Sequence, residues 1–320
     1  MSEDPVYNYR IGPAHITFYL GWKCNARCIM CWQDVARRKQ REKGESPPEL
    51  SFDHFNAILQ RYPSTASIEL CSFGEPMLNP DFGKMLDLLL SHKERWQNVN
   101  IITNGSRLDR FMGIGALPGS LTVSIDSPDP TTYAEIRRGL RLGPVARNVR
   151  SFIDQRTNDQ RFVGINMVLL RKNLDQIEQM AQMAVDIGVD YLALLRGATL
   201  EYTDAAGEGV PEGDPAVKAA IQKIAERFPK LRVIDYFNPE HTGRDKAKQG
   251  HCLHPWINLD VGPDGKTHPC CRAHRLDFGD ALTGNPWDNW TLVELREQIQ
   301  SGKVDAERFP DCAKCPMLLG

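Results

Sequence analysis

Short apolar runs alternate with helix-like segments along most of the chain. Ile, Val and Leu dominate these runs, as expected for strands that are covered on both faces. The six runs are HITFYL (15–20), SIELC (67–71), VNIIT (99–103), LTVSI (121–125), VGINMVLL (163–170) and YLALL (191–195). The segments between them carry apolar residues every three to four positions, as in 51–62, where Ser51 is placed to cap a helix. The alternation predicts an α/β fold.

Six strand–helix units in succession, the last ending in a helix at 215–228, predict parallel strands joined by right-handed crossovers. Six units are too few for a closed eight-fold barrel, so we expect an open, partial (β/α)6 barrel of the TIM type. Ligands of such sheets bind at the carboxyl ends of the strands. The loops that follow the strands are therefore where we expect the functional residues.

The pattern changes after the last of these units. The polar residues 238–251 are typical of a linker. Residues 255–271 predict a β-hairpin that turns at a Pro-Asp-Gly segment, and 291–302 predict a helix that precedes a cysteine-containing tail. We expect two domains, a barrel over 1–240 and a small domain of hairpin and helix over 241–320.

The composition is that of a globular protein. Hydrophobic residues make up 41% of the 320 residues and charged residues 25%, which is enough to bury a sizeable core. The net charge of -2 gives no basic field for nucleic acid or a membrane surface. The chain has no apolar run long enough for a transmembrane helix, and its acidic, polar start is unlike a signal peptide. We therefore expect a cytoplasmic protein with no nucleic-acid or membrane partner.

Nine cysteines fall in two groups with one between them. Disulfides are uncommon in the cytosol, so such grouping indicates metal or redox chemistry. The first group, Cys24, Cys28 and Cys31, follows the first predicted strand. Three thiolates on a short loop can bind three irons of a [4Fe–4S] cluster and leave the fourth iron open to a small molecule. The alternative is a zinc knuckle whose fourth ligand lies far away in the sequence.

The segment CNARCIMC resembles the cluster loop of the radical S-adenosylmethionine (SAM) superfamily, and further motifs follow in the order of that family. SFGEP (72–76) resembles the GGEP segment, TNG (103–105) and SID (124–126) resemble positions near the SAM ribose and carboxylate, and YAEIRRG (133–139) resembles a helix with a basic residue. The resemblance implies that SAM contacts come from Gly74, Glu75, Asn104, Ser124, Asp126, Arg137 and Asn166. The family usually has an aromatic residue just before the third cysteine. Here Met30 takes that place, and Trp32 follows as the candidate aromatic contact.

This resemblance implies that the protein binds a [4Fe–4S] cluster and SAM. An electron from an external reductant such as flavodoxin or ferredoxin would cleave SAM to methionine and a 5′-deoxyadenosyl radical. The radical would then take a hydrogen atom from an unactivated carbon, while the protein orients the reactants and excludes water.

The second group of cysteines comprises Cys252, Cys270, Cys312 and Cys315, enough to saturate another [4Fe–4S] cluster. The segment resembles the auxiliary-cluster domain of radical SAM enzymes in its short "twitch" form of the SPASM domain. The adjacent Cys271 should point away from Cys270, so we expect only one of the two to bind iron, and the spacing favours Cys270. The alternative is a structural zinc site with four cysteines.

We expect a small polar substrate of the sugar or aminocyclitol type, oxidised at a carbinol with the auxiliary cluster as electron acceptor. The first strand starts by residue 15, which leaves no room for an N-terminal peptide-binding module. Two alternatives are an epimerase in which Cys71 or Cys271 donates a hydrogen atom, and a peptide-modifying (RiPP) maturase. An iron–sulfur electron carrier and a zinc-stabilised binding protein are rivals of another class. The basic run 35–45 is either a lid over an anionic substrate or, as we prefer, a solvated loop.

Overall fold

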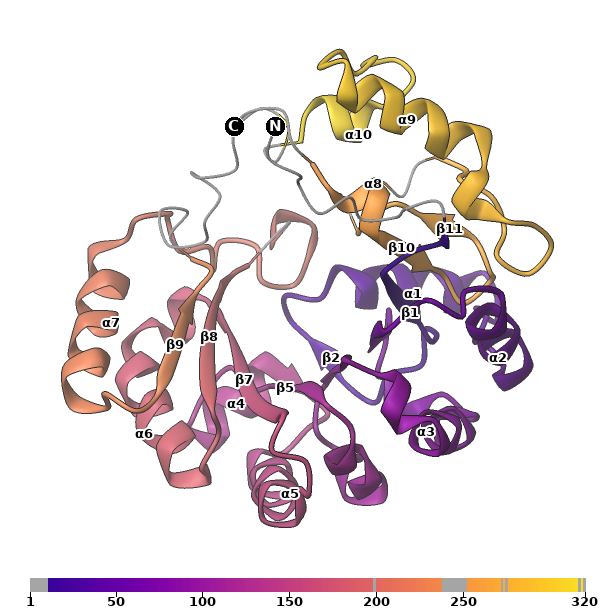
Figure 1. Ribbon diagram of the computed structural model, residues 1–320. Coiled ribbons are helices and arrows are strands. Elements are labelled where there is room, and N and C mark those ends of the chain that lie inside the picture. The colour runs from indigo at the N-terminus through magenta and orange to yellow at the C-terminus, as the bar shows by residue number, and fades with distance from the viewer. Residues whose placement is uncertain are drawn as a thin grey trace, which may run out of the picture.

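The computed structural model describes residues 11–197, 200–237, 252–271, 273, 276–315 and 318. Strands form a curved sheet that stays open, with helices on its convex side and the C-terminal part at one end of the arc (Figure 1). Within the described ranges the sheet has nine strands in the order β11-β10-β1-β3-β4-β5-β7-β8-β9. The expected α/β fold with an open, partial barrel is confirmed.

The sheet contains β1 (His15–Tyr19), β3 (Ser67–Cys71), β4 (Asn98–Thr103), β5 (Gly119–Ser124), β7 (Arg161–Leu169), β8 (Tyr191–Arg196), β9 (Arg232–Asp235), β10 (Asn258–Val261) and β11 (Thr267–His268). Its neighbouring strands are parallel except β10 and β11, which form the expected hairpin. A separate antiparallel pair joins β2 (Arg27–Cys28) to β6 (Arg137–Arg138). The six predicted apolar runs are β1, β3, β4, β5, β7 and β8.

Three strands, β9 and the hairpin strands β10 and β11, extend this sheet beyond the six predicted apolar runs. β9 adds a parallel strand beside β8. At the other edge β10 lies parallel to β1, with His15 opposite Asn258 and Thr17 opposite Asp260. The C-terminal hairpin therefore continues the barrel sheet. The domain boundary at 240/241 stays a prediction, and the linker predicted at 238–251 lies outside the described residues.

The helices are α1 (Trp32–Glu42), α2 (Phe52–Arg61), α3 (Phe82–Ser91), α4 (Pro130–Ile136), α5 (Leu142–Gln155), α6 (Ile177–Ile187), α7 (Pro215–Arg227), α8 (His254–Ile257), α9 (Trp290–Gln300) and α10 (Pro310–Ala313). Short 3-10 helices span Pro76–Leu78, Lys93–Arg95, Leu108–Arg110, Met112–Ala116, Arg171–Gln176, Leu200–Tyr202 and Pro286–Asp288. Ser51 caps α2 as expected, because its side chain accepts a hydrogen bond from the His54 N–H. The helix predicted at 291–302 is α9. The basic run at 35–45 begins within helix α1, which corrects the expectation of a loop.

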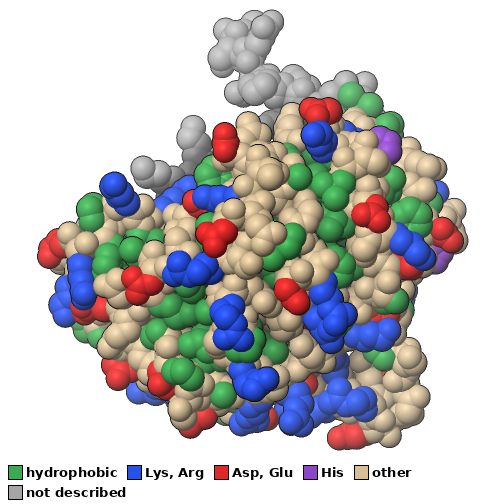
Figure 2. All heavy atoms as spheres, turned by 90° about the horizontal axis from the view of Figure 1, so that it is seen from below, with side chains coloured by type: hydrophobic (Ala, Val, Ile, Leu, Met, Phe, Trp, Pro, Cys, Tyr) green, Lys and Arg blue, Asp and Glu red, His purple; other side chains and the backbone are tan. Residues whose placement is uncertain are grey.

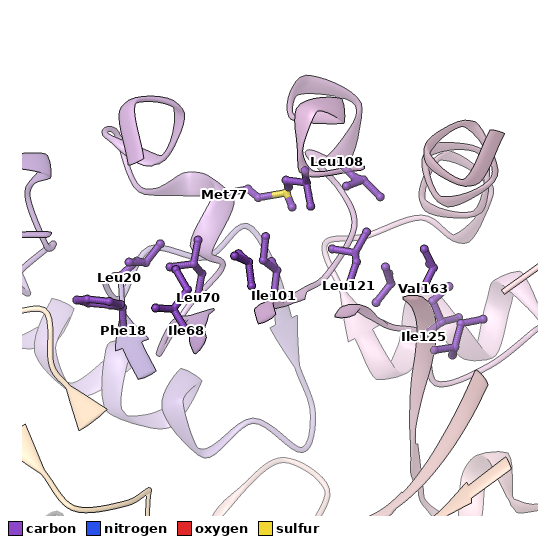
Figure 3. Packing of buried hydrophobic residues seen from close by; sticks show 14 of the residues in the cluster. Phe18, Leu20, Ile68, Leu70, Met77, Ile101, Leu108, Leu121, Ile125 and Val163 are labelled. Carbon is purple, nitrogen blue, oxygen red and sulfur yellow. The ribbon is translucent and has the colours of Figure 1, made fainter. Parts of the chain in front are cut away.

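The main core lies between the sheet and the outer helices. Alternate residues of each strand face it, as Ile68 and Leu70 of β3 do beside Phe18 and Ile101 (Figure 3). The residues between them, such as Glu69, face the concave side, because successive side chains of a strand point to opposite faces. The concave face carries polar side chains, such as Asn100 and Asn166, among apolar ones, whereas the core cluster is apolar.

Basic and acidic side chains are interspersed on the face seen from below (Figure 2). The described helices include none with the length and apolar character needed to cross a membrane.

Candidate functional site

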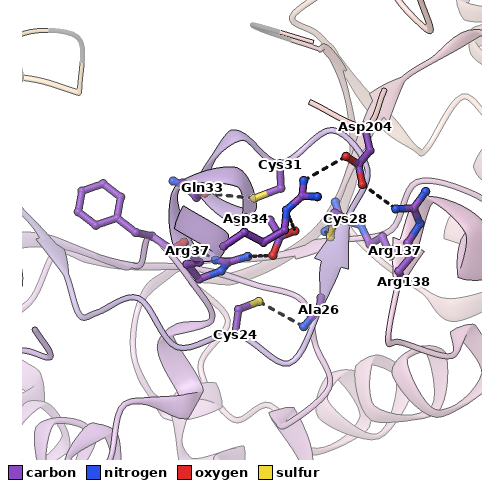
Figure 4. Close-up of polar contacts among 12 residues, drawn as sticks. Cys24, Ala26, Cys28, Cys31, Gln33, Asp34, Arg37, Arg137, Arg138 and Asp204 are labelled. Carbon is purple, nitrogen blue, oxygen red and sulfur yellow. Dashed lines mark hydrogen bonds and ion pairs between the residues drawn. The ribbon is translucent and has the colours of Figure 1, made fainter. Parts of the chain in front are cut away.

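The first three cysteines line one cavity of about 240 Å³ at the carboxyl ends of the strands. Cys24 lies in the loop after β1, Cys28 ends β2, and Cys31 immediately precedes α1 (Figure 4). β2 pairs with β6 so that Cys28 stands opposite Arg137. The fold therefore brings the three thiols and the Arg137 guanidinium to a common cavity.

Each of these thiols already has a polar neighbour. The Ala26 N–H donates to the Cys24 sulfur at 3.4 Å, and Arg137 Nη1 donates to the Cys28 sulfur at 3.7 Å. Burial raises the pKa of Cys28 to about 11, against the opposing effect of Arg137. N–H donors directed at sulfur are the interactions that stabilise cluster thiolates, so the donor set fits a [4Fe–4S] cluster. In the part of the chain that the structure describes, no three Cys, His, Asp or Glu side chains form a group that could hold a single metal ion.

Helix α1 is held against the site by charged residues. Arg37 is buried and donates to the Phe73 carbonyl at 2.8 Å, and it pairs with Asp34 at 3.4 Å. Asp204 accepts from Arg38 of α1 at 3.0 Å and from Arg138 of β6 at 2.7 Å (Figure 4). These contacts connect α1 to the loop after β3 and to the segment after β8.

Gly74 lies where the loop after β3 crosses the cluster loop. Its N–H donates to the Gly21 carbonyl at 3.2 Å, and the next N–H donates to the Lys23 carbonyl at 2.7 Å. A Cβ at position 74 would lie 2.0 Å from the Lys23 carbonyl oxygen, so no side chain fits there. The glycine is required by this close approach of two backbones.

Glu75 is buried and its carboxylate is already bound by the protein. One oxygen accepts from the Thr103 hydroxyl at 2.6 Å, and the other accepts from the Asn104 N–H at 2.7 Å. The Met77 N–H lies at 3.3 Å from the first oxygen. Burial raises the pKa of Glu75, and these hydrogen bonds lower it. The geometry makes Glu75 a residue that joins the loops after β3 and β4.

Asp126 and Arg137 form a buried ion pair of 2.6 Å. The second oxygen of Asp126 accepts from the Val168 N–H at 2.8 Å. Burial lowers the pKa of Arg137, but Asp126 and Cys28 outweigh it and raise the pKa above its usual value. Asp126 is fully buried behind Arg137, so it orients the guanidinium and does not itself line the cavity.

The structure separates the residues expected to contact SAM into two sets. Those that line the cavity with the three cysteines are Gly74, Glu75, Asn104, Ser124 and Arg137. Trp32 lies in a different hollow beside the hairpin, and Asn166 faces the concave side of the sheet. Met30 lines the cavity, so the residue before the third cysteine keeps its place there although it is not aromatic. Sequence reasoning missed Arg37, which also lines the cavity, because it lies within a basic run that carries no motif.

The second set of cysteines also comes together. Burial and the neighbouring Cys270, Cys252 and Cys315 raise the pKa of Cys312 to about 12. Burial, Cys270 and Cys315 raise the pKa of Cys252 to about 11. Cys270 and Cys315 therefore lie near both Cys252 and Cys312. The four thiols fit the ligand set of a second cluster, with Cys270 as a member.

Cys271 faces a different group. Cys271 is exposed. Burial is the main cause that raises the pKa of Tyr19, and the charges of Asp260, Cys71 and Cys271 raise it further. Cys71 is buried and lines the cavity of the first cluster loop. Burial raises its pKa well above 9, so Cys71 is a protonated thiol at neutral pH. Cys71 and Cys271, the two cysteines that are not expected to bind iron, are therefore neighbours.

A larger chamber of about 480 Å³ lies on the concave face of the sheet. Its wall runs from Glu69 on β3 to Arg232 and Tyr236 at β9, and Ile102 lines both this chamber and the cysteine cavity. Two aromatic side chains of the wall are open to it, Phe162 at 53% and Tyr236 at 48% exposure. The chamber therefore adjoins the cysteine cavity at Ile102, and its aromatic groups lie farther along its wall.

A family model described as the radical SAM superfamily matches residues 20–184, just over half of the chain. The "PqqA peptide cyclase" of Ruegeria pomeroyi is 24% identical over 284 residues, which cover 85% of this chain and 71% of that protein. The "tungsten-containing aldehyde ferredoxin oxidoreductase cofactor-modifying protein" of Pyrococcus furiosus is 25% identical over 182 residues, covering 52% and 47%. The chain spans about half the length of the first curated relatives that it matches, 47% and 55%.

Solved structures share the fold. The crystal structure of Streptococcus suis SuiB bound to precursor peptide SuiA aligns with a TM-score of 0.69 at 16% sequence identity. The alignment covers 96% of this chain and 70% of that one. It therefore includes the C-terminal part as well as the barrel.

Proposed function

We propose that this chain, which belongs to the radical SAM superfamily, abstracts a hydrogen atom from a carbon of a peptide substrate. The observation that carries the proposal is the length of the chamber on the concave face. Its wall spans five inter-strand intervals from β3 to β9, or about 24 Å along the curved sheet at about 4.8 Å each. The chamber of about 480 Å³ has room for a short peptide segment, whereas a single sugar ring would fill only part of it.

Two of the similar proteins support a peptide substrate by their names. One is called a peptide cyclase, and the other is described as bound to a precursor peptide. The expectation of a sugar or aminocyclitol substrate gives way to this alternative. The early start of the first strand no longer weighs against a peptide substrate, because the chamber itself has room for a peptide segment.

Cys24, Cys28 and Cys31 would hold the [4Fe–4S] cluster of the family. When bound, the cluster and SAM supply a 5′-deoxyadenosyl radical that takes a hydrogen atom from the substrate, given an electron from an external reductant. The chain's own residues orient the parts: Asp126 fixes Arg137 at the cavity, and Glu75 ties together the loops that surround it.

Cys252, Cys270, Cys312 and Cys315 would hold an auxiliary [4Fe–4S] cluster within the domain predicted over 241–320. Such a cluster would supply a one-electron acceptor, which favours oxidation of the substrate. The second possible outcome is epimerisation, and it rests on Cys71. This protonated thiol lines the cavity of the cluster loop and can return a hydrogen atom to the substrate carbon.

The proposed substrate class is tested with deuterium. The reconstituted enzyme is incubated anaerobically with SAM, a reductant, and either the peptide fraction or the small-metabolite fraction of its source organism grown in D2O. We expect deuterium in 5′-deoxyadenosine from the peptide arm. Transfer from the metabolite arm alone would overturn the proposal.

The two cysteine sets are tested by substitution. Cys28→Ala should abolish SAM cleavage altogether. The double variant Cys312→Ala, Cys315→Ala should lose up to four irons per chain and all product, yet retain some uncoupled SAM cleavage. Full turnover of the double variant would contradict the auxiliary site.

The outcome of the reaction is tested in D2O. For oxidation, Cys71→Ala and Cys271→Ala should both leave the product unchanged. For epimerisation, the wild type should incorporate solvent deuterium at carbon, and one of these variants should release 5′-deoxyadenosine without an inverted product.

A further inference from the structure

Glu69 lies on the wall of the chamber just below the cavity of the cluster loop. It points to the same face of β3 as Cys71, two positions further along, which places the two side chains about 7 Å apart. Cys71 lines the cavity of the three cluster cysteines, and Glu69 lines the adjoining chamber. A group bound to Glu69 would therefore lie close to the place where hydrogen abstraction occurs.

The Glu69 carboxylate makes no hydrogen bond or ion pair with any residue that the structure describes. The other carboxylate of the chamber, Asp190, differs because Arg156 binds it at 2.5 Å. Around Glu69 the sheet presents Thr17 on β1 and Asn100 on β4, which are neutral. Burial and the nearby Asp260 carboxylate raise the pKa of Glu69 to about 7. The local potential is negative, and the carboxylate is open to a ligand.

We propose that Glu69 is a specificity-determining residue that binds a primary ammonium group of the substrate beside the reacting carbon. The inference rests on the proposed function, because in a peptide substrate a lysine side chain would supply the ammonium group. An amino sugar would present the same group, so the chemistry that Glu69 recognises is the ammonium itself. The aromatic groups Phe162 and Tyr236 on the far wall would contact other parts of a peptide, because they lie several strands away.

The test measures binding by calorimetry to the reconstituted enzyme with SAM and no reductant, at pH 8. The probes are two capped pentapeptides, Ac-Gly-Gly-X-Gly-Gly-amide with X as lysine or norleucine, together with glucose and glucosamine, whose affinity is corrected for the fraction protonated at this pH. Wild-type enzyme should bind the lysine peptide at least tenfold more tightly than the norleucine peptide. Glu69→Gln should reduce this ratio to about twofold or less, and Glu69→Asp should keep part of it because it keeps the charge.

The matched control is Glu178→Gln, which removes a carboxylate that pairs with Lys223 on the outer helices. It should retain the wild-type preference. Equal binding of the charged and neutral member of both probe pairs by the wild type would overturn the proposal, as would a preference that survives in Glu69→Gln. If the preference appears with glucosamine alone and neither peptide binds, the role of Glu69 stands and the peptide substrate falls.

Discussion

Replacing Glu69 by glutamine should stabilise the protein at alkaline pH. In the folded protein the pKa of Glu69 rises from 4.5 to about 7, because the carboxylate is buried near Asp260. A carboxyl group with a raised folded pKa favours folding below its unfolded pKa and loses that contribution as the pH rises through the folded value. At pH 8 the wild type therefore carries an ionised Glu69 at a cost that glutamine does not have.

The magnitude follows from the two pKa values. At about 1.36 kcal/mol for each pH unit, the cost at pH 8 has a ceiling of about 3 kcal/mol. Water in the chamber screens part of this, so we expect Glu69→Gln to raise the free energy of unfolding by about 2 kcal/mol at pH 8. At pH 5 the folded carboxyl is protonated and the difference should fall below about 1 kcal/mol.

The assay is urea unfolding followed by tryptophan fluorescence under anaerobic conditions at the two pH values. Glu178→Gln serves as the control, because an exposed ion pair contributes only about 0–1 kcal/mol and its loss should depend little on pH. A Glu69→Gln variant that is less stable than wild type at pH 8, or a difference that grows toward pH 5, would refute the reasoning.

Three further predictions concern the frame of the site. Gly74→Ala should weaken SAM binding at least tenfold in calorimetry, because its Cβ would lie 2.0 Å from the Lys23 carbonyl oxygen. The control Gly143→Ala should leave SAM binding unchanged, because its Cβ would meet only an Arg147 side-chain atom at 3.5 Å. Asp126→Asn should raise the KM for SAM at unchanged iron content, because it removes the 2.6 Å ion pair that orients the cavity guanidinium; an unchanged KM would contradict that role. Arg161→Met should lower the urea midpoint, with a loss of about 3 kcal/mol, because the buried guanidinium donates to three backbone carbonyls.

The strand pattern was predictable because β3, β7 and β8 are long apolar runs between turn signals. β9 was missed because its charged end residues Arg232 and Asp235 leave only two apolar residues between them, too short a run to predict a strand. The pairing of β10 with β1 joins segments more than 240 residues apart, and no local pattern records such a contact. Local periodicity predicts individual helices and strands, whereas the order of strands in a sheet depends on long-range packing.

Helix α1 was taken for a loop for a related reason. Its buried side includes Asp34 and Arg37, which pair with each other, and Arg37 also donates to the Phe73 carbonyl. Hydrophobic periodicity cannot detect a helix whose inner face is held by charges. The cysteines were recognisable because their spacing is a chemical motif. The Glu75 carboxylate, in contrast, was expected to contact SAM and is bound by Thr103 and Asn104, which only the fold brings together.

The concave face of the sheet shows why specificity should reside there. The chain fills only part of this face with its own side chains. The Tyr191 ring lies across Gly164, where any Cβ would come within 2.0 Å of it, and its hydroxyl contacts the Thr122 hydroxyl at 2.6 Å. The space between this ring and Glu69 is left to a ligand. A polar wall of this kind costs stability when it is empty, because the half-buried Glu69 carboxylate has no partner among the residues that the structure describes. The same carboxylate makes binding selective, because a ligand with an ammonium group pairs with it and a ligand without one leaves it unpaired.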